Sequence, residues 1–293
     1  MNGTGKTDSR AVDGYGFTSR VNRGIAARDR RRILHAVYER FHRAEFISPD
    51  PLEVLYRYRD RLDREIAGII ASSLAYGRVA QILASVDTVL GRMGPSPRAF
   101  LEDTGSDDLR EIFTGFKHRF TTDAELVAVL TGVRDTLRRH GSLQACFMRG
   151  IRAGDETTIP ALAAFSRSLY PACGDESCSL IPDPARKSAC KRLHLFLRWM
   201  VRCDEIDPGG WEYVDPAKLV IPLDTHMHRI CRQLGMTERS QGDEKTALEI
   251  TGVFREIMPE DPVRYDFSLT RLGMMKGDAG LTIEQYRRPN NTR

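Results

Sequence analysis

The sequence predicts an all-α fold, and two observations lead to that prediction. Apolar residues recur every three or four positions over several long segments, which is the spacing of one face of an amphipathic helix. No run of alternating β-branched residues bounded by hairpin turns occurs, so we expect no sheet. The chain has 293 residues, of which 41% are hydrophobic, and this is enough for one large domain or two small ones.

The ends of the chain are polar, and nothing in it resembles a membrane segment. We expect residues 1–27 to form a disordered basic tail and residues 281–293 a polar tail. No apolar signal segment is present, and the longest apolar stretch, 66–76, is too short to span a bilayer. The six cysteines therefore indicate reduced thiols in a cytoplasmic protein, and the spacing of Cys173 and Cys178 fits no strong zinc pattern.

The first half of the chain predicts helices in close succession. The first has Leu34, Val37, Tyr38 and Phe41 on one face. Asp50 followed by Pro51 is a helix start signal, a cap and then proline at the first helical position. Strong periodicity over 66–74 and 79–93 predicts two buried helices joined by a tight, polar turn around Gly77. Further helices are expected over 123–140, 159–170, 244–257 and 261–272.

The segment 187–202 predicts a helix with a cationic polar face. Five basic residues fall on one stripe of this helix, at steps of four, three, four and four: Lys187, Lys191, His194, Arg198 and Arg202. A solvated face is the ordinary outcome of such a run. However, the stripe carries no acid to pair with at i,i+4, and like charges at that spacing cost free energy. The stripe therefore suggests a polyanionic partner.

A turn separates this helix from the next one. Asp204-Glu-Ile-Asp-Pro-Gly-Gly-Trp211 carries a strong turn signal and predicts a hairpin. The apolar lead-in 219–223 then reaches Asp224, after which apolar residues recur with helical spacing as far as Gly235. Aspartate is a preferred N-cap, and the helix dipole favours negative charge there, so we expect Asp224 to stay ionised at neutral pH.

The tetrapeptide Leu223-Asp224-Thr225-His226 resembles a signature of the helix-hairpin-helix DNA glycosylases, the endonuclease III superfamily. Over roughly residues 60–275 the order of elements also resembles that superfamily. The chain departs from endonuclease III itself, because it lacks a Leu-Pro-Gly-Val-Gly-type hairpin followed by lysine, and has no cysteines after Cys231 for an iron–sulfur loop. It is more similar to archaeal 8-oxoguanine DNA glycosylase, whose catalytic lysine lies farther upstream; here Lys191 precedes Asp224 by 33 positions.

This resemblance implies a two-lobed fold with the active-site cleft between the lobes. One lobe would comprise residues 28–60 and 186–280, and the other residues 61–185, with insertions at 103–123 and 141–180. The implied partner is double-stranded DNA with a damaged base, most simply an oxidised purine such as 8-oxoguanine. We expect a nucleoid-associated monomer that needs no cofactor or metal and does not contact a membrane.

The resemblance also implies a mechanism. Lys191 would attack C1′ of the sugar to form a Schiff base, Asp224 would assist, and strand nicking by β-elimination would follow. The neighbouring cations are expected to favour the neutral, nucleophilic amine of Lys191. Lys187, one turn earlier, is the alternative nucleophile. The candidate contacts to DNA or to the base are Arg78, Gln81, Lys187, His194, Arg198, His226 and His228.

Two other functions fit part of the sequence. The same fold could bind a DNA or RNA structure without catalysis, but the joint presence of Lys191 and Asp224 favours chemistry. A metal hydrolase would use Asp224, His226 and His228, whose donors suit zinc or manganese. Residues 226 and 228 point about 200° apart on a helix, which disfavours a shared ion. Trp199 and Trp211 are expected in the core rather than stacked on a base.

Overall fold

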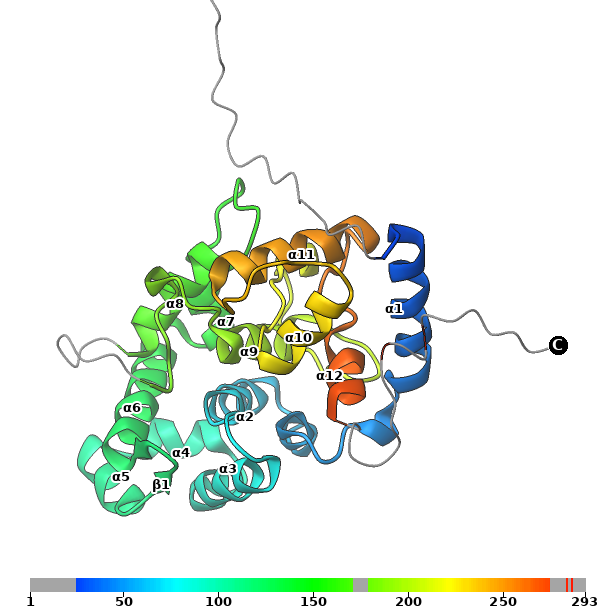
Figure 1. The fold of residues 1–293 in the computed structure, drawn as a ribbon. Helices are drawn as coiled ribbons and strands as arrows, with labels where there is room; N and C mark the ends of the chain where they lie inside the picture. Colours follow the sequence, from blue (N-terminus) through cyan, green and yellow to red (C-terminus); the bar gives the residue numbers. More distant parts are fainter. Residues whose placement is uncertain (1–24, 171–178, 275–282, 284–285, 287–293) are drawn as a thin grey trace, which may run out of the picture.

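The computed structural model describes residues 25–170, 179–274, 283 and 286, and most of them lie in helices (Figure 1). The α-helices are α1 (Ala27–Phe41), α2 (Arg61–Ser73), α3 (Val79–Met93), α4 (Pro97–Asp103), α5 (Ser106–Phe113), α6 (Asp123–His140), α7 (Leu143–Met148), α8 (Ile159–Leu169), α9 (Lys191–Val201), α10 (Thr225–Gln233), α11 (Glu244–Ile257) and α12 (Asp266–Met274). The 3-10 helices are η1 (Ala44–Phe46), η2 (Pro51–Arg57), η3 (Pro184–Arg186) and η4 (Pro216–Lys218). The predicted all-α class is therefore confirmed.

One small ribbon was not expected. Strands β1 (Lys117–His118) and β2 (Thr121–Thr122) pair antiparallel, with His118 opposite Thr121. The ribbon supports the turn between α2 and α3, because the Tyr76 hydroxyl donates a hydrogen bond to the His118 carbonyl at 2.8 Å. Each strand has only two residues, which is too short to leave a periodic signal in the sequence.

Segments distant in the sequence pack together on either side of a central helix pair. Near the C-terminal end, α12 packs against both α1 and α10, while α6 packs against α5, α7 and α8. Figure 1 shows α2 and α9 between these two groups, and the two helices pack on each other. Gly68 on α2 permits this approach, since a Cβ there would lie 3.2 Å from the Phe196 ring. Both expected core tryptophans, Trp199 and Trp211, are buried.

The basic helix α9 begins at Lys191 rather than at Lys187. Lys187 and Cys190 have φ values of 61° and 41°, which interrupt a right-handed helix. The Lys187 carbonyl instead accepts a hydrogen bond from the Glu244 amide at 3.1 Å, at the start of α11. Thus a long-range contact ends the helical pattern that the local sequence suggested.

Other boundaries also differ from the sequence prediction. The segment begun by Asp50 is capped as expected, with the Leu52 amide donating to its carboxylate at 2.9 Å, but it forms the 3-10 helix η2. The last helix begins at Asp266, not at Asp261. The short helices α4, α5 and α7 were not expected; α5 and α7 lie in the two stretches interpreted as insertions.

Several predictions concern residues outside the described ones. These are almost all of the two tails and the close pair Cys173 and Cys178. Among the helices that the structure describes, none has both the length and the apolar character needed to cross a bilayer.

Candidate functional site

Lys191 and Asp224 meet where α9 and α10 begin. Lys191 is the first residue of α9, Asp224 is the N-cap of α10, and Lys191 Nζ lies 3.2 Å from Asp224 Oδ2. The lysine side chain is 33% exposed and the aspartate side chain 23% exposed. An amine and a carboxylate in contact, both reachable from solvent, form a pair that can carry out nucleophilic and acid–base chemistry.

Local structure holds the Asp224 carboxylate in place. Its Oδ1 accepts a hydrogen bond from the Met227 amide at 2.8 Å, as expected for an N-cap. The lead-in is buried as predicted, and the Ile221 amide donates to Thr251 Oγ1 on α11 at 3.1 Å. Burial alone would raise the pKa of Asp224, but the Lys191 charge, the Met227 amide and nearby His226 outweigh it. The net pKa is lowered, so the carboxylate is ionised at neutral pH, in agreement with the prediction.

A small cavity of about 40 Å³ opens beside the pair. It is lined by Asp50, Lys191, Leu195, Arg198, Pro222, Asp224, Asp266, Phe267 and Thr270. A water molecule takes up about 30 Å³ in the liquid, so the cavity has room for about one water. In this conformation it is smaller than a nucleobase. The carboxylates of Asp50, the N-cap of η2, and of Asp266, the first residue of α12, were not expected at this site from the sequence.

Arg198 lies at the inner wall of this cavity and is not available to DNA, contrary to our prediction. Its side chain is only 4% exposed. Its guanidinium forms ion pairs with Asp207, at 3.1 Å, and with Asp266. Burial raises the pKa of Asp266 to about 6, even though Arg198 acts to lower it. Arg202 is likewise buried and paired with Asp204, Asp207 and Asp261.

His194 and Lys187 also depart from the predicted basic stripe. His194 is 4% exposed, and its burial lowers its pKa to about 4, so the ring is neutral at pH 7 and faces the interior. Lys187 is outside the helix and pairs with Glu244 at 3.1 Å. The stripe thus does not form an exposed cationic face. Lys187 and Arg198 are instead paired with carboxylates and His194 is uncharged, so these three residues do not supply the free positive charge expected to favour the neutral amine of Lys191.

The turn between α2 and α3 does lie beside the start of α9. Arg192, next to Lys191, donates a hydrogen bond to the Ser73 carbonyl at 2.8 Å and stacks over the Tyr76 ring at 5.0 Å. Arg78 and Gln81, the two candidates at this turn, are exposed. The turn that carries both candidates is therefore held against the residue next to Lys191.

The two histidines of α10 face different neighbours. His226 is exposed, and its Nδ1 lies 3.3 Å from the Arg229 guanidinium. His228 Nε2 donates to the Arg239 carbonyl at 2.9 Å, in the loop leading to α11. The two rings therefore do not converge on one point. This agrees with the helical repeat, which places positions 226 and 228 on different sides of a helix. Within the described residues, no group of three or more His, Cys, Asp or Glu side chains is arranged to hold a metal ion.

Sequence reasoning missed Asp50, Asp266, Arg229 and Arg232 as site candidates. Asp50 was interpreted only as a cap, and Asp266 carried no motif. Arg229 and Arg232 are three positions apart on the exposed face of α10, and this spacing is the sequence signal that could have identified them.

The chain belongs to the family described as "Protein of unknown function (DUF2400)", whose model matches residues 50–275. The match covers η2 to α12, and so includes Lys191, Asp224 and both carboxylates at the cavity. Comparison with curated proteins and with solved structures found no significant match.

Proposed function

We propose that this chain is a DNA repair glycosylase with AP lyase activity, of the two-lobed helix-hairpin-helix kind, acting on duplex DNA with a damaged, most simply oxidised purine, base. The observation that carries the proposal is the approach of Lys191 Nζ to Asp224 Oδ2 at 3.2 Å. The two residues are 33 positions apart in the sequence, and the family resemblance pairs the same two residues independently of their distance in space. Both retain solvent access, unlike His194 and Arg198, which are buried on the same helix.

In this proposal the ion pair is the resting state, and one proton must leave the ammonium before attack. Asp224 is the carboxylate next to it. When DNA covers the pair and excludes water, separated charges become costly, which favours proton transfer from Lys191 to Asp224. Asp224 would thus act as the base that frees the amine.

The chemical steps then follow in order. The neutral Lys191 amine forms a bond to C1′, and the bond from C1′ to the base breaks, with its electron pair leaving on the base, which takes up a proton. The lysine nitrogen then loses a proton, and the C1′–O4′ bond breaks as the C1′=N bond of the Schiff base forms, with O4′ leaving as a hydroxyl group after it takes up a proton. Removal of a C2′ proton expels the 3′ phosphate by β-elimination, and hydrolysis of the imine frees Lys191.

Borohydride trapping tests the proposal, because it reduces the imine to a stable amine. Duplexes with 8-oxoguanine, uracil, thymine glycol or an abasic site are each incubated with the protein and borohydride. We expect a covalent complex with at least one damaged base, absent for Lys191→Gln. Lys187→Gln is the matched control, since Lys187 is exposed and pairs with Glu244 instead. Equal trapping by Lys191→Gln and the wild type would remove Lys191 from this role.

A binding function without catalysis is the alternative, and the small cavity favours it. A space of about 40 Å³ does not admit a base unless α9, α12 or η2 moves. Tight binding of damaged duplex without a trapped band on any substrate would support this alternative. A band only with abasic DNA would indicate a lyase rather than a glycosylase for the lesions tried.

A further inference from the structure

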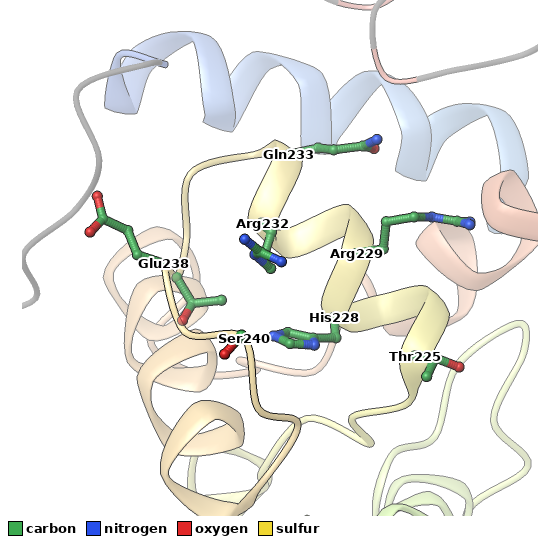
Figure 2. Close-up of a pocket in the computed structure, with 8 residues that line it drawn as sticks. Thr225, His228, Arg229, Arg232, Gln233, Glu238 and Ser240 are labelled. Atoms are coloured by element: carbon green, nitrogen blue, oxygen red, sulfur yellow. The ribbon is translucent and has the colours of Figure 1, made fainter.

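A second and much larger hollow lies on the outer face of α10. Its volume is about 670 Å³, and it is lined by Thr225, His228, Arg229, Arg232, Gln233, Thr237, Glu238 and Ser240. Figure 2 shows the hollow between α10 and the loop that follows it, with His228 and Ser240 turned toward each other. One of its lining residues, Thr225, directly follows Asp224 in the sequence.

The hollow is basic, and its cations are not neutralised by acids. Arg229 and Arg232 are both exposed, and neither has a carboxylate partner among the residues that the structure describes. Glu238 is the one acid in the lining, and Figure 2 shows its carboxylate at the rim, pointing away from α10. Guanidinium groups that are not paired with carboxylates are suited to bind phosphate oxygens.

Other lining groups extend this phosphate chemistry. Thr225 and Ser240 add hydroxyl groups at opposite edges of the hollow. The His228 ring is held in place, since its Nε2 donates to the Arg239 carbonyl at 2.9 Å. Together these groups resemble the mixed cationic and hydroxyl contacts that proteins make to a nucleic-acid backbone.

We propose that this hollow binds backbone phosphates of the DNA strand whose nucleotide enters the Lys191–Asp224 site. This inference rests on the function proposed above. The nine residues of α10 span about 13 Å, and a DNA strand carries one phosphate per about 3.4 Å of duplex axis. A strand running along α10 from Asp224 would therefore bring several phosphates past Arg229 and Arg232. A free phosphorylated molecule is the other source of the same chemistry.

The salt dependence of DNA binding tests the hollow directly. Binding of an undamaged fluorescent duplex is measured by anisotropy at several salt concentrations, for wild type and for Arg229→Gln/Arg232→Gln. Removing one arginine that neutralises a phosphate should reduce the slope of log K against log salt by about 0.9, so we expect the slope to fall by about 2 in the double variant. The control is Arg152→Gln/Arg167→Gln, which removes the same charge at two exposed arginines outside the hollow. Its slope should equal that of the wild type.

Two further measurements separate the possible outcomes. Titration with inorganic pyrophosphate reports a free phosphate ligand: tight binding that needs Arg229 and Arg232, with an unchanged DNA slope, would overturn the DNA assignment. An unchanged slope without pyrophosphate binding would overturn the site altogether. Trapping by the wild type reports the chemistry separately, so that a missing trapped band with a reduced slope contradicts the glycosylase proposal and leaves the hollow as a DNA-binding surface.

Discussion

The helices α9 and α10 both carry closely spaced basic residues, but they use them in opposite ways. On α9, Arg198 is 4% exposed and held by Asp207 and Asp266. On α10, Arg229 and Arg232 face solvent and have no carboxylate partner within the described structure. The sequence suggested that the basic stripe on α9 contacts a ligand, whereas the structure shows that the exposed arginines are on α10.

The difference shows that local charge pattern does not reveal whether a cation is paired. When a helix has no acidic residues at i,i+4, its cations are unpaired only if no carboxylate from another part of the chain packs against them. Here the partners of Arg198 come from nine and 68 positions away. The two helices meet at their N-termini, where Lys191 pairs with Asp224. Comparing them therefore separates arginines that are buried and paired from arginines that are exposed to solvent.

The largest expected effect is at this meeting point. Asp224→Asn keeps a good N-cap residue but removes the negative charge beside Lys191. If the carboxylate moves protons in the reaction, the rate of Schiff base formation should fall by about 10²–10⁴-fold. Stability should change by at most about 1 kcal/mol, since the pair is partly exposed. Single-turnover borohydride trapping and urea unfolding measure the two effects, and an unaffected trapping rate would exclude Asp224 from the chemistry.

The next effect concerns the buried arginine. Arg198→Met leaves Asp266 without its cationic partner and removes one of the two buried arginines that pair with Asp207. Breaking a buried pair in this way should cost about 3–5 kcal/mol of unfolding free energy. Arg232→Met, the matched change on α10, should alter stability by less than about 0.5 kcal/mol. Chemical denaturation measures both, and similar decreases in the two variants would remove the distinction between the helices.

His194 extends the comparison to pH. Burial lowers its pKa to about 4 from an ordinary 6.5, so below pH 6.5 the unfolded chain binds a proton that the folded chain does not. The stabilising contribution of the neutral ring is thus complete above pH 6.5, and is lost as pH falls toward 4, by about 3 kcal/mol in total. His194→Leu removes this titration. Its unfolding free energy should fall less than that of the wild type between pH 7 and pH 4, and parallel curves would contradict the assignment.

What the sequence predicted correctly depends on short-range interactions. The helical class and the Asp224 cap follow from residues within one or two turns of each other, such as Met227 three positions away. The predicted start of α9 was wrong because the Lys187 carbonyl accepts a hydrogen bond from the Glu244 amide, 57 positions later. The proximity of Lys191 to Asp224 was implied by a family resemblance rather than by any local pattern. Asp266, one of the two carboxylates that line the cavity besides Asp224, is brought there by the packing of α12.

The smallest expected effect tests whether the hollow on α10 has a stability cost. Arg229 and Arg232 are like charges at i,i+3, which destabilise a helix by about 0.2–0.5 kcal/mol at low ionic strength. Arg232→Gln should therefore stabilise the protein without DNA by a few tenths of a kcal/mol, and added salt should remove the gain. Arg167→Gln on α8 is the control, because Arg167 is exposed and has no ion pair within the described residues. Urea unfolding at low and high salt measures the difference. A gain in Arg232→Gln together with weaker DNA binding would mean that the arginine is retained for a ligand rather than for the fold, whereas Arg198 is retained for the fold.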